Sequence, residues 1–245
     1  MLVKRSKILV LAPHTDDGEF GCGGTIAKFI QEGHDVYYAA FSACQQSVLP
    51  QFPSDILITE VKEATRILGI KPENLILFDY DVRTFGYHRQ EILDDLIKLR
   101  TDINPDLVFI PTITDIHQDH HTIAEEGLRA FKFSSILSYE LPWNNFSFTT
   151  SSFIHLSEEN IRTKVNALKA YQSQAHRPYS DEDFIRSLAR TRGVQIGTRY
   201  AEAFEIIRWI INWFLLGSIN KTLNINLLIY LFCFKFWILN EIYQY

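Results

Sequence analysis

The chain has 245 residues, 47% of them hydrophobic, which is enough to bury one sizeable core in a single domain. Its 24 basic residues fall short of its 29 acidic ones and form no long run, so a nucleic-acid backbone is excluded as the expected partner. Cys22, Cys44 and Cys233 are too few and too far apart for a disulfide framework or a thiolate metal cage. We expect a reducing, cytoplasmic location, because the N-terminus also lacks the length and cleavage site of a signal peptide.

Short apolar runs alternate with helical patterns through the first two thirds of the chain. The runs suit strands that are buried on both faces, and they occupy residues 8–12, 36–41, 75–78 and 107–110. Apolar residues at helical spacing lie at 61–68 and 92–103, and Gly33 and Gly69 are suited to end two of the helices. This alternation predicts an α/β fold, in which a Rossmann-like parallel sheet is flanked by helices within a single domain.

The pattern loosens after Pro142. It predicts a strand or hairpin near residues 146–156 and a helix whose apolar face spans 161–168. Ser157 suits the start of that helix, and the run Ser180–Asp183 suits the start of another.

The last part of the chain has a different composition, rich in Ile, Leu, Asn and aromatic residues and poor in acids. We therefore predict a catalytic domain over residues 1–208 and an apolar tail over 209–245. The most apolar stretch, 223–239, is interrupted by polar residues and is short of the roughly 20 residues that a spanning helix needs. Three interpretations of this tail remain open. It could be a membrane-associating segment, a contact between subunits, or a non-native sequence at the end of the open reading frame.

Two polar clusters follow predicted strands. The first covers residues 13–19, directly after the first strand, and the second covers 117–121, after the strand at 107–110. Ligands of open parallel sheets bind at the carboxyl ends of the strands. We therefore expect both clusters to converge on one site.

The residue types in these clusters suit a catalytic metal ion. Zinc and iron(II) sites typically use three protein ligands from His and Asp and keep a position open for water. His14, Asp17 and His120 would supply the ligands. Asp16 points in a different direction from its neighbour and can act as the general base that takes a proton from the attacking water.

The clusters also resemble the signature segments of the PIG-L/LmbE-like N-acetylglucosaminyl deacetylase family. The resemblance covers Lys7 to Arg208 and rests on Pro13–Asp17, Gly21–Gly24, His117–His120, Tyr171–Gln174 and Gly197–Phe204. These motifs are specific for the family and much less so for the substrate. Thr15 departs from the proline that many relatives carry, which loosens the loop slightly and removes no functional group.

The resemblance implies the same three metal ligands and Asp16 as the general base, which would later deliver its proton to the departing amine. It also implies that His117 helps to stabilise the tetrahedral oxyanion. Asp119 would orient His117 or one of the metal ligands.

Two further residues are candidates for substrate contact. Arg83 follows the third strand, where it could hold a sugar hydroxyl or a phosphate, or pair with Asp81 on the surface. Glu202 lies in the last family-like segment, where it could contact the site or form a salt bridge with Arg190 or Arg192.

Other polar features have simpler interpretations. The run Gly21–Gly24 could cradle a phosphate, but it lacks the full Gly-x-Gly-x-x-Gly pattern and has acids nearby, so we predict close packing of the first helix. Cys22 is then a small buried residue. The remaining histidines are expected on the surface or at the edge of the core: His34, His88, His121, His155 and His176.

Together these observations predict a Zn²⁺-dependent hydrolase, with Fe²⁺ as the alternative metal, that removes the acetyl group from an N-acetylated amino sugar. The partner would be a small molecule or a glycoconjugate. Three alternatives stay open. The protein could be another amide hydrolase of the same fold, a sugar- or nucleotide-binding module without turnover, or a membrane-tethered protein that acts through its tail.

Overall fold

The computed structural model describes residues 5–210 of the chain. One sheet contains the strands β1 (Lys7–His14), β2 (Asp35–Ser42), β3 (Leu75–Leu77), β4 (Leu107–Pro111), β5 (Ser135–Tyr139), β6 (Ser152–Leu156) and β7 (Tyr200–Arg208). Their order is β3-β2-β1-β4-β5-β7-β6, parallel from β3 to β5 and antiparallel where β7 joins β5 and β6. The predicted α/β fold with a mostly parallel sheet is confirmed. The antiparallel edge formed by β7 and β6 was not predicted.

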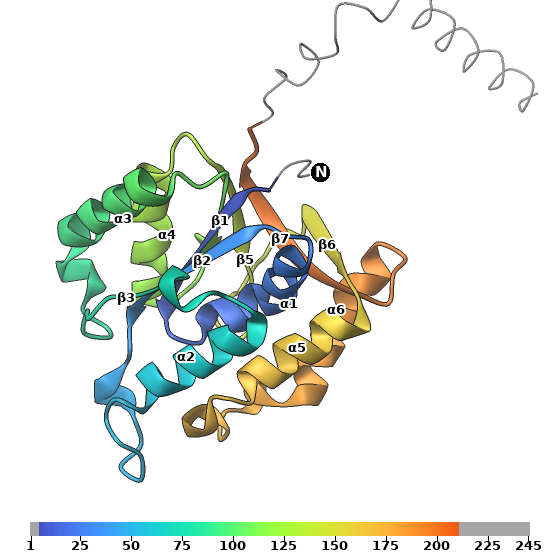
Figure 1. Cartoon of the computed structure of the whole chain (residues 1–245), viewed down its shortest axis with the longest axis horizontal. Coiled ribbons are helices and arrows are strands. Elements are labelled where there is room, and N and C mark those ends of the chain that lie inside the picture. Colours follow the sequence, from blue (N-terminus) through green and yellow to red (C-terminus); the bar gives the residue numbers. More distant parts are fainter. Residues whose placement is uncertain (1–4, 211–245) are drawn as a thin grey trace, which may run out of the picture. The chain divides into compact units, whose positions relative to one another are not determined.

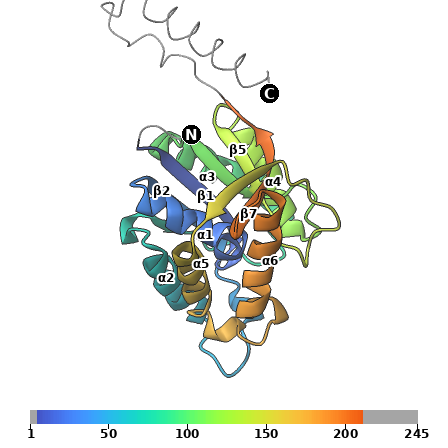
Figure 2. The same cartoon turned by 90° about the vertical axis from the view of Figure 1, so that its right-hand side faces the viewer.

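Helices cover both faces of this sheet (Figures 1 and 2). On one face lie α1 (Asp17–Gln31), α2 (Ile56–Leu68), α5 (Glu158–Leu168) and α6 (Glu182–Gln195), and on the other lie α3 (Arg89–Ile103) and α4 (Gln118–Ala130). Short 3-10 helices are η1 (Gln45–Ser47), η2 (Pro72–Asn74), η3 (Phe85–Tyr87), η4 (Gln172–Gln174) and η5 (Pro178–Ser180).

The central strand β1 is apolar throughout because both of its faces are buried. Ile8 and Val10 join the core on the α1 side, whereas Leu9 and Leu11 join the core on the α3 side. Successive side chains of a strand point to opposite faces, so a strand covered on both faces reads as a continuous apolar run.

Most predicted element ends agree with the structure. Gly33 and Gly69 follow α1 and α2 with φ of +86° and +91°, a region that glycine adopts at little cost. The side chain of Ser157 accepts a hydrogen bond from the backbone of Asn160 at the start of α5. The side chain of Asp181 does the same for α6, and only the 152–156 part of the expected strand or hairpin forms a strand.

The run Gly21–Gly24 packs closely against the rest of the fold, as predicted. A Cβ atom at position 21 would overlap the ring of Tyr139, and one at position 24 would lie 2.5 Å from a methyl carbon of Leu156. Cys22 is fully buried between them. These glycines let α1 lie against β5 and β6 with no room for a side chain, so they serve packing and do not form an anion cradle.

Residues 5–209 belong to one compact unit. Within residues 5–210 the structure contains no helix with the length and apolar character required to cross a membrane. The predicted tail lies outside the described residues from position 211 onwards, and its role and the domain boundary at 208 remain predictions.

We predict that Gly21→Ala destabilises the protein by about 1–3 kcal/mol, the usual cost of overpacking a filled core, because the added methyl group must displace the Tyr139 ring. Gly86→Ala is the matched control, since no atom lies within 4 Å of its Cβ position. Urea unfolding monitored by circular dichroism measures both. Equal midpoints for the two variants would show that the close packing at position 21 carries no energetic weight.

Candidate active site

The candidate site lies at the carboxyl ends of the neighbouring strands β1 and β4. His14 is the last residue of β1, and Asp16 and Asp17 follow it at the start of α1. His117 directly precedes α4, and His120 lies in the first turn of that helix, so both reach the same edge of the sheet. These five residues line a cavity of about 310 Å³. The two polar clusters therefore converge.

Three of these side chains direct one atom each to a common point. His14 Nδ1 lies 3.1 Å from Asp17 Oδ2, and His120 Nε2 lies 3.2 Å from the same oxygen. The two ring nitrogens are 3.1 Å apart. Nitrogens of His14, His117 and His120 also lie within 4.8 Å of one another, so the histidines form a group that is able to hold a metal ion. The Oδ2 atom of Asp17 lies beside the nitrogens of His14 and His120.

In His14 and His120, the ring nitrogen that faces away from Asp17 contacts a carboxylate. His14 Nε2 lies 3.0 Å from Asp119 Oδ2, and His120 Nδ1 lies 2.8 Å from Asp115 Oδ2. Such partners fix the orientation and tautomer of an imidazole that binds a metal. Asp119 therefore contacts His14, one of the two expected targets. Asp115 was missed by the sequence analysis, although a carboxylate five positions before a candidate ligand histidine was an available signal.

His117 has a different hydrogen-bonding state from the other two histidines. It caps the start of α4, where its Nδ1 accepts a hydrogen bond from the backbone N–H of Asp119 at 3.2 Å. In the neutral ring the proton then resides on Nε2, as assigned from this hydrogen bond. Burial and the charges of His14 and His120 lower the pKa of His117 to about 4. His117 is therefore a neutral hydrogen-bond donor at pH 7.

Electrostatics at the site are dominated by the buried carboxylate of Asp17. Burial would raise the pKa of Asp17, but the charges of His120 and His14 outweigh it and hold the pKa well below its usual range. Burial would lower the pKa of both histidines, but Asp17 outweighs it, and the pKa of His120 rises to about 10. A proton on the His120 ring therefore balances the charge of Asp17 at pH 7.

Asp16 is the exception among these acids. Burial, and next the neighbouring charge of Asp17, raise the pKa of Asp16 to about 6. Its carboxyl is half-buried and lines the cavity. Asp16 is therefore ionised at pH 7 and becomes protonated only slightly below neutrality.

Asp119 also fixes the chain after β3. It accepts a hydrogen bond from the backbone N–H of Arg83 at 2.6 Å, and the Gln118 side chain donates to the Arg83 carbonyl at 3.1 Å. These contacts hold Arg83 at φ +71°, a conformation that is costly for a residue with a side chain. The expected alternative, an ion pair with Asp81, is absent from the described residues, and the guanidinium lies 3.5 Å from Ser47 Oγ.

A buried acid supports the turn between His14 and Asp17. Glu19 is fully buried, and its carboxyl group lies within hydrogen-bond distance of the hydroxyls of Tyr38 and Tyr171. Both hydroxyls also lie within hydrogen-bond distance of the Thr15 carbonyl, at 2.9 and 2.7 Å. Burial raises the pKa of Glu19 to about 8. Tyr171, from the fourth family-like segment, thus holds the loop that carries the catalytic candidates.

An aromatic cluster forms one wall of the cavity, and the sequence analysis did not single it out. The rings of Trp143 and Tyr179 stack with their centroids 3.9 Å apart, and Phe20 meets both edge-on. All three residues line the cavity. A flat aromatic wall beside polar groups is a common arrangement in pockets that bind small polar ligands.

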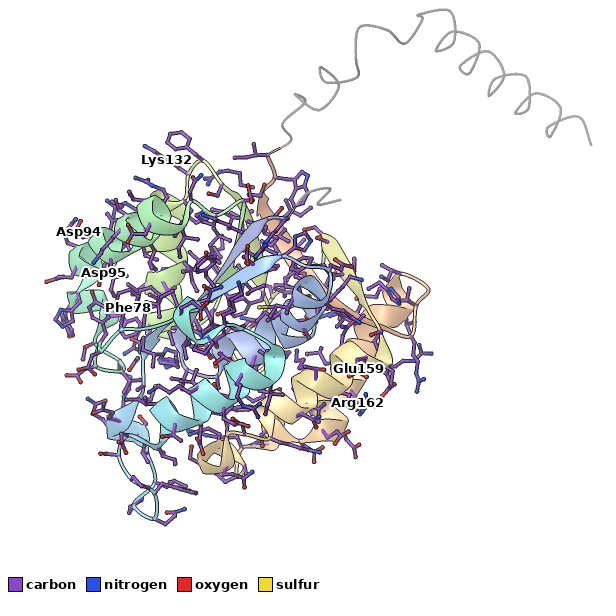
Figure 3. The ribbon with its side chains drawn as sticks, viewed as in Figure 1. Phe78, Asp94, Asp95, Lys132, Glu159 and Arg162 are labelled. Atoms are coloured by element: carbon purple, nitrogen blue, oxygen red, sulfur yellow. The ribbon has the colours of Figure 1, made fainter. Side chains whose placement is uncertain are left out.

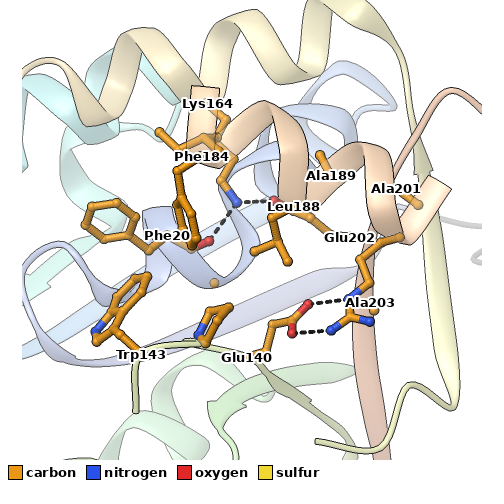
Figure 4. A pocket seen from close by; sticks show the side chains of 14 residues that line it. Phe20, Glu140, Trp143, Lys164, Phe184, Leu188, Ala189, Ala201, Glu202 and Ala203 are labelled. Atoms are coloured by element: carbon orange, nitrogen blue, oxygen red, sulfur yellow. Dashed lines mark hydrogen bonds and ion pairs between the residues drawn. The ribbon is translucent and has the colours of Figure 1, made fainter. Parts of the chain in front are cut away.

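Glu202 lies apart from the catalytic cluster. Its carboxylate accepts hydrogen bonds from the backbone of Gly24 and Thr25 and pairs with Lys164 at 2.7 Å (Figure 4). The predicted salt-bridge partners were wrong, because Arg192 pairs with Glu140, and Arg190 donates to backbone carbonyls. The adjacent cavity measures about 20 Å³, room for about one water molecule. Substrate contact by Glu202 remains a prediction, and these contacts do not favour it.

Several known proteins are similar to this chain in sequence. The PIG-L family, described as GlcNAc-PI de-N-acetylase, matches residues 9–131. The uncharacterized deacetylase YaiS of Escherichia coli (strain K12) is 30% identical, over 69% of this chain and 92% of its own length. Diacetylchitobiose deacetylase of Thermococcus kodakarensis is 24% identical, over 82% of this chain and 83% of its own.

A solved structure extends the likeness to the fold. N,N'-diacetylchitobiose deacetylase from Pyrococcus horikoshii, complexed with its inhibitor MPG, superposes with a TM-score of 0.70 and is 23% identical. The match covers 89% of this chain and 88% of that one.

We predict that Zn²⁺ binding becomes tighter by about tenfold per pH unit between pH 6 and 8, because a ligand nitrogen must lose its proton before it can bind a metal. The raised pKa of His120, about 10, keeps its ring protonated at pH 7 in the metal-free protein, so raising the pH favours the metal over the proton. Competition with a chelating dye at several pH values measures this dependence. An affinity that does not change with pH would contradict a site built on His120.

We also predict that Asp115→Asn weakens Zn²⁺ binding by about 10- to 100-fold, the usual effect of removing a carboxylate that orients a ligand histidine. Asp94→Asn is the charge-matched control, because Asp94 is exposed on α3 (Figure 3). The same dye competition applies, with circular dichroism to confirm folding. Equal Zn²⁺ affinities of the two variants would show that Asp115 does not contribute to metal binding.

Proposed function

The chain belongs to the PIG-L/LmbE-like deacetylase family, and on this basis we propose that it is a Zn²⁺-dependent hydrolase that removes the acetyl group from an N-acetylated amino sugar or glycoconjugate. The observation that carries the proposal is the triangle of His14 Nδ1, Asp17 Oδ2 and His120 Nε2, with edges of 3.1–3.2 Å. Three buried ligand atoms face one point, beside an ionisable carboxyl and a neutral imidazole. This arrangement suits metal-assisted hydrolysis.

The residues fit a catalytic zinc ion. His14, Asp17 and His120 would hold it, because two imidazoles and one carboxylate are a ligand set that zinc and iron(II) both accept. When bound, the metal would act as a Lewis acid on the substrate carbonyl and lower the pKa of water. His117 also belongs to the group of histidines within 4.8 Å of one another, but we do not propose it as a ligand, because its Nε2 bears the ring proton in the tautomer assigned above.

Asp16 and His117 divide the proton chemistry. Asp16 accepts a proton from the water whose oxygen attacks the acetyl carbonyl carbon, and the Nε2–H of His117 donates a hydrogen bond to the developing oxyanion. As the carbon–nitrogen bond breaks, Asp16 returns the proton to the nitrogen. The products are acetate and the free amino sugar. A pKa of about 6 suits Asp16 to both steps.

The proposal that the substrate is a sugar is supported by other observations than the proposal of hydrolysis. The stacked rings of Trp143 and Tyr179 line the cavity and offer a face on which a sugar ring can pack. Two of the relatives are deacetylases of diacetylchitobiose by name. Another amide hydrolysis would use the same catalytic groups, so the identity of the amine is the open part of the proposal.

We predict that zinc-loaded protein releases acetate from at least one compound in a panel of N-acetylhexosamine derivatives, and that Asp16→Asn lowers the rate by about 100-fold or more, as expected for loss of a general base. Chelation should have a similar effect. Asp102→Asn, at an exposed position of α3, is the matched control and should keep the wild-type rate.

The pH profile gives a second test of Asp16. Its pKa is raised by burial, so the carboxylate is lost as the pH falls through about 6, and kcat/KM should fall with it. Metal-loaded protein that frees no acetate from any compound would sink the deacetylase proposal. It would leave a binding module or a different amide as the function.

A further inference from the structure

Two arginines near the catalytic cavity lack the partners that the other arginines have. Between residues 5 and 210, every other arginine forms an ion pair with a carboxylate or donates to a backbone carbonyl. Arg83 reaches only Ser47 Oγ at 3.5 Å, and Arg177 reaches only the side-chain oxygen of Gln174 at 3.5 Å. Neither guanidinium lies over an aromatic ring in this part of the chain.

Arg177 lines the catalytic cavity, and Arg83 contacts a residue that lines it. Arg177 and Gln174 line it together with the catalytic candidates. Ser47, the contact of Arg83, lines it as well. Both side chains are exposed, so their guanidinium groups are accessible to a ligand that enters from solvent.

The segment that carries Arg177 is fixed to the catalytic loop. Tyr171, at its start, donates a hydrogen bond to the Thr15 carbonyl at 2.7 Å. Ser173 donates to the buried carboxylate of Glu60 from its backbone at 2.8 Å and from its hydroxyl at 2.5 Å. Beyond Arg177, Tyr179 stacks on Trp143. Arg177 therefore projects from an anchored segment.

The charge balance makes these two cations informative. The chain has a net charge of −5, so carboxylates are available to neutralise surface arginines, and they do so elsewhere. A planar guanidinium binds phosphate or carboxylate oxygens through paired hydrogen bonds. A guanidinium without a carboxylate partner in the cavity lining, with a second one beside it, suits an anionic group that the ligand itself brings.

We infer that Arg177 and Arg83 bind an anionic substituent of the substrate, so that the substrate is an N-acetylated amino sugar bearing a phosphate or a carboxylate. This inference rests on the proposed function and narrows it. It predicts that this chain prefers an acidic sugar to a neutral disaccharide such as diacetylchitobiose. Phosphate and carboxylate share the recognition chemistry, and the assay distinguishes them.

The test compares kcat/KM for acetate release from N-acetylglucosamine 1-phosphate, N-acetylmuramic acid and neutral N-acetylglucosamine. At least one acidic compound should exceed the neutral one by about tenfold or more, and this ratio should fall by about tenfold in Arg177→Gln, as expected when one charge-assisted contact is lost. Arg83→Gln should also lower it. Added salt should lower the wild-type ratio, because it screens exposed charges.

Arg162→Gln is the matched control, since it removes the same charge from an exposed position on α5, where Arg162 pairs with Glu159 (Figure 3). It should keep the wild-type ratio. A wild-type enzyme with no preference for either acidic compound, or a preference that survives both Arg177→Gln and Arg83→Gln, would overturn the inference.

Failure of the proposed function can be distinguished from failure of this inference. If no compound releases acetate, calorimetric binding of the same compounds still tests the two arginines. Tighter binding of an acidic sugar by the wild type than by Arg177→Gln would then support the anion site without the hydrolase. Equal binding of acidic and neutral sugars would exclude it.

Discussion

The site depends on one buried charge, the carboxylate of Asp17 between the rings of His14 and His120. Burying an unpaired carboxylate costs many kcal/mol, so the fold must supply positive charge beside it. Two further buried carboxylates, Asp115 and Asp119, contact the far nitrogens of the same rings. Acids thus outnumber the groups that can neutralise them. Protons on the rings can supply the missing positive charge. A divalent cation would supply it better, because its charge is larger and it can bind three ligand atoms at once.

This cluster stays in place because several contacts hold the turn after β1. Glycines at positions 21 and 24 let α1 approach β5 and β6 closely. Tyr38 and Tyr171 both reach the Thr15 carbonyl and the buried carboxyl group of Glu19. Residues of the segments Gly21–Gly24 and Tyr171–Gln174 therefore support this turn by close packing and by hydrogen bonds.

The sequence predicted the parts of the molecule that depend on local pattern. Apolar runs predicted the strands from β1 to β4, and Ser157 and Asp181 predicted helix starts, because burial and capping leave signals within a few residues. The clusters at 13–19 and 117–121 could be brought together because both follow strands of one parallel sheet.

Contacts between residues far apart in the sequence could not be predicted in this way. Lys164 and Glu202 are 38 positions apart, and no local signal connects them, so the expected partners Arg190 and Arg192 were wrong. Asp115 was missed because the pattern of a carboxylate before a histidine is common, and its contact with His120 Nδ1 depends on the path of the loop. The antiparallel edge of the sheet likewise depends on how β7 returns to pair with β5.

The same anchoring contacts connect specificity to catalysis. Asp119 orients His14 with one carboxylate oxygen and holds the backbone of Arg83 with the same oxygen, so the ring and this arginine cannot shift independently. Arg177 is connected to the catalytic turn through Tyr171 and the Thr15 carbonyl. An anion bound by the arginines and an amide carbonyl placed at the histidines would therefore be held at a set separation. Selection would then depend on how far the anionic group lies from the N-acetyl group, as well as on the charge itself.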